Sequence, residues 1–167
     1  TSMCYPVSSM SCHVSACPNH QTQRTTPFAT RGAIASLGAT GYELDLTKLS
    51  EEEKAQVREQ IENYKQIDEL VLKGDLYRLS DPFQSNYFCE MLVGKDKTRA
   101  YVVGERFRGD PCDHDRVLKL CGLDEGKRYA IRELNVTASG AALMGAGLFY
   151  PRLPDCGSWI WHIEEVR

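Results

Sequence analysis

The spacing of apolar residues along the chain changes character at Gly74. Before this residue, short apolar segments are separated by long polar stretches and by one strongly helical segment, whereas from Asp75 onward short apolar runs follow one another between turn residues. The first pattern is typical of strands that alternate with helices, and the second of short antiparallel strands. The sequence therefore predicts an α/β part over residues 1–74 and an all-β domain over residues 75–167.

The clearest local signal is a helix start at Ser50. Ser50 and Glu53 have the spacing of a capping box, and three consecutive glutamates oppose the positive end of the helix dipole. The apolar stripe expected to be buried has steps of three and four residues and consists of Val57, Ile61, Tyr64, Ile67 and Val71. Gly74 supplies the stop, so we expect one long helix between Ser50 and Gly74.

The first fifty residues predict two strands and a short helix. Residues 3–7 are mostly apolar and predict a strand, which a long polar loop over residues 11–26 follows. Pro27 is a favourable first helical residue and predicts a helix over residues 28–37, and the period-two pattern of residues 41–46 predicts a second strand. Strand, helix, strand, helix is the order of two units of a (β/α)8 barrel, which needs about 250 residues. We therefore expect the last two units of a barrel, in a chain that is a piece of a longer protein.

Six short candidate strands fall in the second part. They cover residues 76–79, 87–93, 98–107, 116–121, 128–134 and 159–166, and turn residues separate them. Regular short strands with such turns predict an antiparallel β-sandwich. The small apolar residues 139–148 fit either a turn of helix or the start of a strand.

Composition narrows the choice of partners. The net charge of −3 offers no basic surface to a polyanion, so nucleic acid is not an expected partner. The sequence has neither an apolar run of about 18 residues nor a charged-then-apolar leader, so we expect no membrane association. The seven cysteines are an odd number, which favours reduced thiols in a cytoplasmic protein.

Two clusters have residue types that bind metals. The first consists of Cys12, His13, Cys17 and His20, and the second of Asp110, Asp113, His114 and Asp115. The spacing of the first lacks the paired arrangement of zinc sites, and small buried thiols explain it better. The second is interpreted as a polar surface turn. We expect no metal and no cofactor.

Four ordered blocks resemble glycoside hydrolase family 36. They read SCHVSACPNHQTQRTTPFATRG at residues 11–32, GYELDL at 41–46, TKLSEEEK at 47–54 and GDLYRLSDPF at 74–83. The second half is similar to the C-terminal β-sandwich of that family mainly in layout, with CGLD at 121–124 and SGAALM at 139–144 as its best pieces. Ala39-Thr40 departs from the family pattern. The chain thus looks like the C-terminal part of a family 36 α-galactosidase.

The resemblance implies hydrolysis of terminal α-galactosides, such as melibiose and the raffinose series, with retention of configuration. One carboxylate attacks the anomeric carbon, and a second, about 5 Å away, protonates the leaving oxygen and then activates water. In the family both are aspartates near the ends of the fourth and sixth barrel strands. Because the resemblance places residues 3–7 on strand seven, both aspartates precede Thr1. No catalytic residue is therefore expected in this chain, and the parent enzyme is expected to be a homo-oligomer.

Two acids in the chain have spacing that suits a paired site. Glu43 and Asp45 lie two residues apart on one predicted strand, so their side chains would share a face. Hydrogen bonding in the barrel interior, or packing against Arg24 or Arg31, is the favoured interpretation, because two nearby acids on a strand are common.

The loop after the first strand is the best candidate for substrate contact, since barrel active sites form at the carboxyl ends of strands. Ser8, Ser9 and His13 are predicted to bind a galactose hydroxyl or to support the acid/base aspartate. The alternative is that the region around His20 only closes the barrel or makes a subunit contact.

An independent sugar-binding module is the second hypothesis. It would use Trp159, Trp161 and Tyr150 as an exposed platform, although buried tryptophans are favoured on a strand that covers a sandwich core. An exposed apolar face would instead favour the fragment of a barrel enzyme. Such a face would consist of Phe28, Ile34, Leu37 and Val57.

Overall fold

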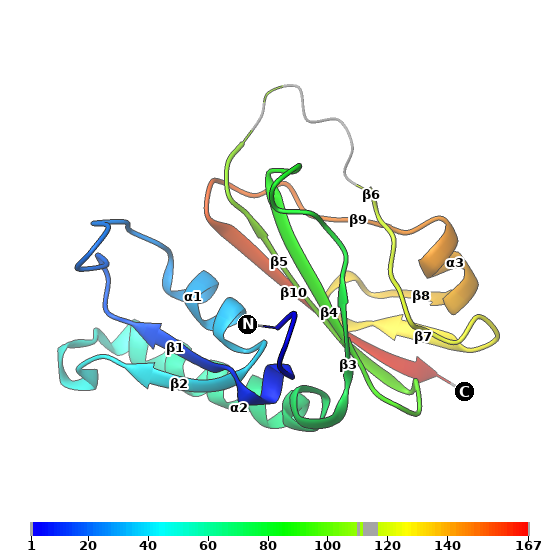
Figure 1. Ribbon diagram of the computed structural model, residues 1–167, viewed down its shortest axis with the longest axis horizontal. Helices are drawn as coiled ribbons and strands as arrows, with labels where there is room; N and C mark the ends of the chain where they lie inside the picture. The colour runs from blue at the N-terminus through cyan, green and yellow to red at the C-terminus, as the bar shows by residue number, and fades with distance from the viewer. Residues whose placement is uncertain (1, 110, 112–116, 167) are drawn as a thin grey trace.

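The computed structural model describes residues 2–109, 111 and 117–166. An α/β part formed by the first 74 residues lies beside a curved antiparallel sheet formed by the rest, and the N-terminal segment runs between the two (Figure 1). The elements of the α/β part are the 3-10 turn η1 (Val7–Ser9), β1 (Ser11–Ser15), α1 (Phe28–Ala35), β2 (Ala39–Glu43), the 3-10 turn η2 (Leu46–Lys48) and α2 (Glu51–Lys73).

The two predicted βα units are present. β1 and β2 are parallel, with Ser11 opposite Ala39 and Ser15 opposite Glu43. A parallel pair needs a crossover connection, and α1 supplies it. The α/β class predicted for this part is therefore confirmed.

The first strand is not where the sequence analysis put it. Residues 3–7 form a turn that leads into η1, and the strand is Ser11–Ser15, inside the stretch predicted to be a polar loop. Pro6 cannot donate to a strand ladder, and Tyr5 is 64% exposed, whereas Val7 alone is buried against α2. In β1 only Val14 is buried and Cys12 is partly buried, so the alternation is too short to stand out from the polar residues around it.

The other boundaries of this part moved by a few residues. α1 ends at Ala35 rather than at residue 37, and β2 covers residues 39–43 rather than 41–46. The strand stops early because Asp45 caps η2: its carboxylate accepts a hydrogen bond from the backbone N–H of Thr47 at 3.0 Å. An Asp at such a position favours a turn over an extended strand.

Helix α2 begins as predicted, but its buried stripe differs. The Ser50 hydroxyl accepts from the Glu53 N–H at 3.1 Å, and the Glu53 carboxylate accepts from the Ser50 N–H at 2.9 Å. Ile61 is 39% exposed and Tyr64 is half-buried, whereas Leu70, absent from the prediction, is buried. The buried face rotates along the helix because Val57 packs under β1 and α1, while the C-terminal turns pack on the antiparallel sheet.

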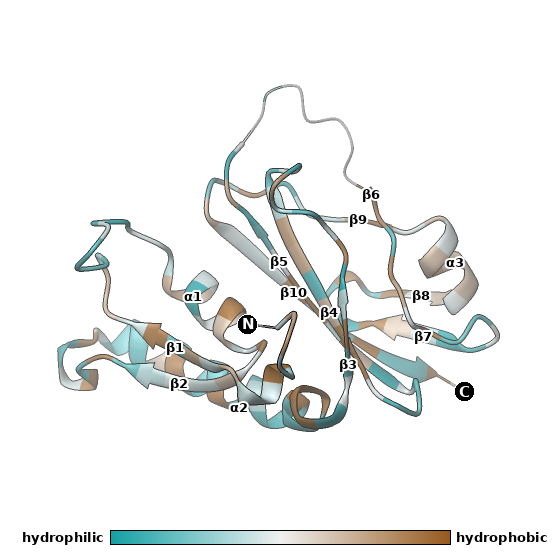
Figure 2. Cartoon of the chain, viewed as in Figure 1, coloured by the Kyte–Doolittle hydropathy of each residue, from teal (hydrophilic) through white to brown (hydrophobic). Residues whose placement is uncertain are grey.

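The second part is an antiparallel sheet of six strands, in the order β3-β4-β5-β10-β7-β8. Its members are β3 (Asp75–Arg78), β4 (Tyr87–Val93), β5 (Arg99–Arg106), β10 (Gly157–Val166), β7 (Arg128–Ile131) and β8 (Val136–Ser139). Hydrophobic residues concentrate along the central strands β4, β5 and β10 (Figure 2). The predicted antiparallel architecture is confirmed.

A second layer covers one face of this sheet. It consists of the two-stranded ribbon of β6 (Val117–Leu118) and β9 (Leu148–Phe149) and of α3 (Gly140–Gly145), while the 3-10 turn η3 (Arg132–Leu134) contacts α2 through the bond from Arg132 to Gln66. The stretch that the sequence left undecided is thus a short helix, capped by the Ser139 hydroxyl, which accepts from the Ala142 N–H at 3.2 Å. The predicted strand at 128–134 ends at Ile131, where η3 begins.

The α/β part covers the opposite face of the sheet. One hydrophobic cluster combines Leu37, Ile67 and Val71 of the α/β part with Tyr101 and Val103 of β5. The boundary between residues 74 and 75 therefore marks a change of architecture within a shared core, and its role as a domain boundary stays a prediction. No helix among the described residues is long and apolar enough to cross a membrane.

Candidate functional site at the carboxyl ends of the parallel strands

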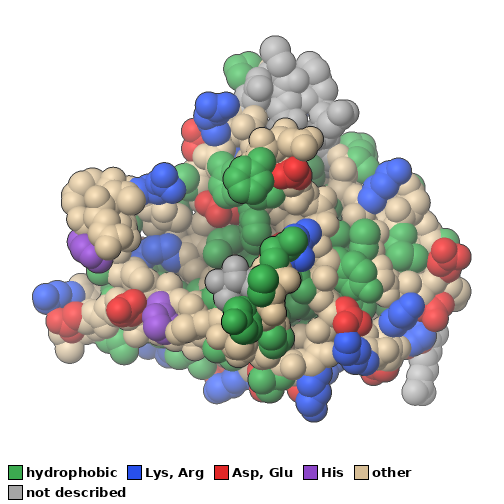
Figure 3. All heavy atoms as spheres, viewed as in Figure 1, with side chains coloured by type: hydrophobic (Ala, Val, Ile, Leu, Met, Phe, Trp, Pro, Cys, Tyr) green, Lys and Arg blue, Asp and Glu red, His purple; other side chains and the backbone are tan. Residues whose placement is uncertain are grey.

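The carboxyl ends of β1 and β2 lie next to each other, with Ser15 opposite Glu43. Val14 and, in part, Cys12 point into the core beneath α1, so Ser11, His13 and Ser15 occupy the open face of the strand. His13 lies over Gly41 of β2, where an added Cβ would come within 3.2 Å of its ring. Histidine side chains are exposed over β1 and the following loop (Figure 3).

His13 is held from both sides. The Ser11 hydroxyl is 2.8 Å from its Nε2, and a carboxylate oxygen of Glu43 is 3.4 Å from its Nδ1. Because the side chains of His13 and Glu43 are 43% and 74% exposed, solvent screens this pair and it contributes little to stability. What the contacts do is orient an imidazole on the open face of β1, close to its carboxyl end.

The loop that follows β1 is built around Asn19. Its side-chain oxygen accepts from the N–H groups of Gln21 and Thr22 at 3.0 Å, and its own N–H donates to the Arg24 carbonyl at 2.9 Å. The Cys17–Pro18 peptide bond is cis. These bonds fold residues 19–24 back on themselves, so the long loop has a defined shape without secondary structure of its own.

Arg31 forms hydrogen bonds with both the loop and the strand β1. It donates to the Ser15 carbonyl at 2.5 Å and to the Thr26 carbonyl at 3.2 Å, and its guanidinium lies 4.8 Å from the centre of the Phe28 ring. The last carbonyl of β1 is thereby satisfied by a charged donor, which makes a stronger hydrogen bond than a neutral one.

A cavity of about 540 Å³ opens between β1, this loop, α1 and β5. Polar side chains that line it include Asn19, Thr22, Arg24, Arg31 and Glu105. Partial burial raises the pKa of Glu105, and the positive charge of Arg24 opposes that rise. The antiparallel sheet therefore contributes a carboxylate to a cavity whose other walls belong to the α/β part.

The candidate serines lie at the other end of the strand. Ser8 and Ser9 are in η1, before β1, and the Ser9 hydroxyl donates to the Pro6 carbonyl at 2.7 Å. The sequence analysis expected a strand that ended at residue 7, and it therefore placed the two serines at the carboxyl end of that strand. Because the strand is Ser11–Ser15, the two serines precede it instead. Of the three predicted substrate-binding residues, only His13 lies on the face that leads to the loop.

The two acids do not share a strand face. Glu43 is the last residue of β2, while Asp45 lies outside the strand, where hydrogen bonds from Thr47 lower the pKa of its carboxyl. The Asp45 carboxylate also lies 3.6 Å from the Lys48 ammonium. Asp45 is therefore a capping residue, and the paired-acid arrangement is wrong.

Neither of the two possible metal clusters gains support. Within the described ranges, no group of three or more His, Cys, Asp or Glu side chains is arranged to hold a metal ion. Burial raises the pKa of Cys12, as it does for a thiol that packs against the core. Asp110, Asp113, His114 and Asp115 lie outside the described residues.

The proposed aromatic platform is part of the core. Trp159, Trp161 and Tyr150 are 7%, 2% and 6% exposed, and the Tyr150 and Trp159 rings stack at 5.4 Å. The expectation of buried tryptophans is confirmed, and a sugar cannot stack on them. The exposed apolar face that would have favoured the fragment of a barrel enzyme is not seen among these residues, because Phe28, Leu37 and Val57 are buried and Ile34 is partly buried.

Sequence reasoning missed the contribution of β5. Glu105 follows Tyr101 and Val103 at intervals of two, so it points to the same face of the sheet. That alternation was available in the sequence, but nothing local indicated that this face packs against the loop after β1.

Comparison with known proteins agrees with this geometry. The melibiase family model matches residues 1–74, and the model of the glycosyl hydrolase family 36 C-terminal domain matches residues 87–163. The α-galactosidase AgaA of Geobacillus stearothermophilus is 41% identical over the whole chain. The chain belongs to glycoside hydrolase family 36.

A further relative and a solved structure agree with this assignment. The bifunctional α-galactosidase/sucrose kinase AgaSK of Mediterraneibacter gnavus is 44% identical over 90% of the chain. A crystal structure of an AgaA variant in complex with raffinose superimposes with a TM-score of 0.94 at 40% identity, over 99% of this chain and 23% of that one. The chain spans 23% of the length of AgaA and 16% of that of AgaSK.

Proposed function

We propose that this chain is the C-terminal part of an α-galactosidase that releases terminal α-galactose from oligosaccharides of the melibiose and raffinose type. The observation that carries the proposal is the pair of parallel strands that end beside a polar cavity, in a chain of glycoside hydrolase family 36. The 41% identity to a part of AgaA over the whole of this chain and the raffinose complex of an AgaA variant support the substrate class.

The catalytic carboxylates belong, in this proposal, to barrel strands that precede Thr1. A double displacement needs two carboxyl groups about 5 Å apart, one free to attack and one free to exchange a proton. Asp45 is unsuited to either role because Thr47 holds it as a cap. The chain contributes the last two strands of the barrel, the loop over the cavity and the sheet that packs behind them.

His13 is the substrate-contacting residue that we propose in this chain. Its imidazole is oriented by Ser11 and Glu43 on the open face of β1, which is the inner face when such strands close a barrel. From there it donates to, or accepts from, a galactose hydroxyl. Ser8 and Ser9 have no such position.

The remaining expectations for the whole protein are proposals of the same kind. We propose that it is a cytoplasmic homo-oligomer that needs no cofactor and binds neither nucleic acid nor membranes. The net charge of −3 and the absence of a basic cluster in the sequence support the part about nucleic acid.

The test uses the protein extended upstream of Thr1 through its reading frame, assayed with a nitrophenyl α-galactoside. We expect nitrophenol release, and we expect His13→Ala to lower kcat/KM by about fivefold, mainly through a higher KM, since one hydrogen bond to a neutral hydroxyl contributes about 1 kcal/mol.

The matched control is Arg58→Ala, an exposed residue of α2 that does not line the cavity. It should keep the kinetics of the unsubstituted protein. Equal kinetics for His13→Ala and Arg58→Ala would remove His13 from the substrate site, and an extended protein that releases nitrophenol only from β-galactosides would contradict the proposed activity.

A further inference from the structure

The loop after β1, residues 16–27, is fixed at its two ends. Arg31 of α1 donates to the Ser15 carbonyl just before the loop and to the Thr26 carbonyl near its end. The Cys17 thiol donates to the same Thr26 carbonyl, at 3.7 Å. The ends of the loop are therefore bonded to each other and to the helix that follows.

The middle of the loop has no such attachment. Within the described part of the chain, each hydrogen bond made by residues 19–24 has its partner inside that same segment. These bonds give the segment its own shape, but they do not fix it relative to the strands beneath. Its position over the cavity of about 540 Å³ therefore depends on a different interaction.

Glu105 faces this segment from the antiparallel sheet. It is the last residue but one of β5, with Phe88 of β4 and Ser158 of β10 opposite it. Tyr101 and Val103 precede it at intervals of two and are fully buried against the α/β part. The Glu105 carboxylate thus lies at the end of a buried row, where the sheet borders the cavity.

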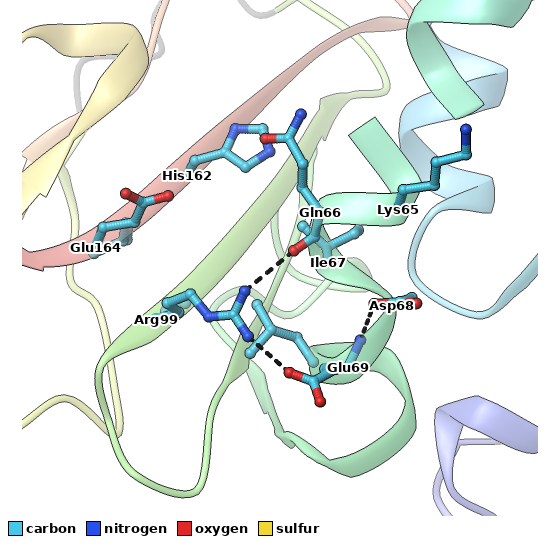
Figure 4. Close-up of a pocket in the computed structure, with 11 residues that line it drawn as sticks. Lys65, Gln66, Ile67, Asp68, Glu69, Arg99, His162 and Glu164 are labelled. Atoms are coloured by element: carbon cyan, nitrogen blue, oxygen red, sulfur yellow. Dashed lines mark hydrogen bonds and ion pairs between the residues drawn. The ribbon is translucent and has the colours of Figure 1, made fainter. Parts of the chain in front are cut away.

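Strand β5 is also bonded to the α/β part at its start. Arg99, its first residue, donates to the Gln66 carbonyl at 3.5 Å and to the Glu69 carboxylate at 3.0 Å, and both acceptors belong to α2 (Figure 4). Because these bonds and the buried row fix β5 against the α/β part, the backbone that carries Glu105 has a set position relative to the loop.

Arg24 is the loop residue whose charge acts on Glu105. Both residues line the cavity. Partial burial raises the pKa of Glu105, and the positive charge of Arg24 opposes that rise. Among the described residues, neither side chain has a hydrogen bond to another group, so the attraction between the two charges is what connects them.

The other charged groups near the loop have partners of their own. The Arg31 guanidinium is bonded to two backbone carbonyls. The Glu43 carboxylate lies 3.4 Å from the His13 imidazole, and the Asp45 carboxylate lies 3.6 Å from a lysine ammonium. Of the described residues that line the cavity, Glu105 is the one acid. The partner of the loop arginine therefore comes from the sheet.

We propose that Glu105 is a positioning residue, which holds residues 19–24 of the loop in place over the cavity through its attraction to Arg24. The loop follows the carboxyl end of β1, where the substrate site of a (β/α)8 barrel forms, so the antiparallel sheet takes part in shaping that site. The inference deepens the proposed function and rests on it for the effect on turnover.

The test measures amide hydrogen exchange by mass spectrometry in the protein extended upstream of Thr1. Glu105→Gln removes the charge and keeps the size of the side chain. We expect residues 19–24 to exchange about threefold faster, and residues 87–93 of β4 to exchange at an unchanged rate. Glu125→Gln is the matched control, because Glu125 is an exposed acid of the second part of the chain and does not line the cavity.

Arg24→Gln tests whether Glu105 acts through Arg24, which is exposed and can be replaced without altering the core. We expect the same increase in loop exchange for Arg24→Gln and no further increase for the double variant, because either change removes the same interaction. Increases that multiply in the double variant would overturn the proposal. So would loop exchange in Glu105→Gln equal to that in Glu125→Gln, or equally faster exchange of residues 87–93, which indicates a general loss of stability.

Kinetics with a nitrophenyl α-galactoside provide the second measurement. Glu105→Gln should raise KM about threefold and leave kcat unchanged, because the loop affects substrate binding and not the reacting groups. An unchanged KM would contradict a role of Glu105 in shaping the site. An extended protein that is inactive without any substitution would contradict the proposed function instead, and the exchange of residues 19–24 would still decide whether Glu105 holds the loop.

Discussion

A single close contact, at Gly104 of β5, decides how the Trp159 ring of β10 packs on the sheet. A Cβ added to Gly104 would lie 2.0 Å from Cζ2 of Trp159, which pairs with it across β5 and β10. The glycine therefore makes room for the Trp159 ring, and Tyr150 stacks on that ring nearly parallel, at 12°. No local sequence signal indicates this dependence, because it arises from the strand register.

We expect Gly104→Ala to lower the free energy of unfolding by about 1–3 kcal/mol, since the Trp159 ring must shift in a closely packed core. Gly145→Ala is the control: an added Cβ there has nothing within 4 Å, and alanine favours a helix, so stability should stay equal or rise slightly. Urea unfolding followed by tryptophan fluorescence measures both. Equal midpoints for the two variants would show that the ring adapts without cost.

Elements with a local cause were the ones that the sequence predicted well. The capping box at Ser50 and the bounds of β4 at residues 87–93 are as expected, because caps and alternating apolar residues act within a few positions. The strand Ser11–Ser15 was missed because its pairing with β2 spans almost thirty residues and only Cys12 and Val14 face inward. The rotation of the buried face of α2 has the same origin, since two different neighbours cover its two halves.

The capping box gives a prediction at this scale. Ser50→Ala removes the acceptor of the Glu53 N–H and should lower the free energy of unfolding by about 1 kcal/mol. Ser50→Thr keeps a hydroxyl acceptor and should therefore keep most of the stabilisation by the cap. Ser8→Ala serves as the control because it leaves both capping bonds intact. A midpoint of Ser50→Ala in thermal unfolding that matches the control would mean that tertiary packing alone holds the start of α2.

The candidate site shows a similar division between local and long-range signals. His13 was singled out because of its residue type and its position in the motif at residues 11–32, and its contact with substrate stays a prediction. The expected position of Ser8 and Ser9 at the carboxyl end of a strand and the pairing of Glu43 with Asp45 were wrong, because each depended on a strand boundary that lay elsewhere. Substrate contact by the two serines stays a prediction. Glu105 was not found, since its contribution depends on how β5 packs against the loop after β1.

At the scale of the whole molecule, the α/β part and the sheet act as one body. They share a hydrophobic cluster, and the Tyr101 hydroxyl of the sheet lies within hydrogen-bonding distance of both the Ser36 hydroxyl and the Asn63 amide, each at 3.1 Å. The sheet therefore supports the two βα units from behind while their open face, with His13, is left uncovered by the described residues. A chain that spans 23% of the length of AgaA provides, on this account, a rigid part of a larger catalytic barrel.

The most direct test of this account compares nitrophenyl α-galactoside turnover by the 167-residue chain with turnover by the protein extended upstream through its reading frame. The account predicts nitrophenol release by the extended protein and none above buffer by the 167-residue chain, because the proposal assigns both catalytic carboxylates to strands upstream of Thr1. Turnover by the 167-residue chain would contradict it, since the reaction would then depend on carboxylates that the account assigns to caps and surface contacts.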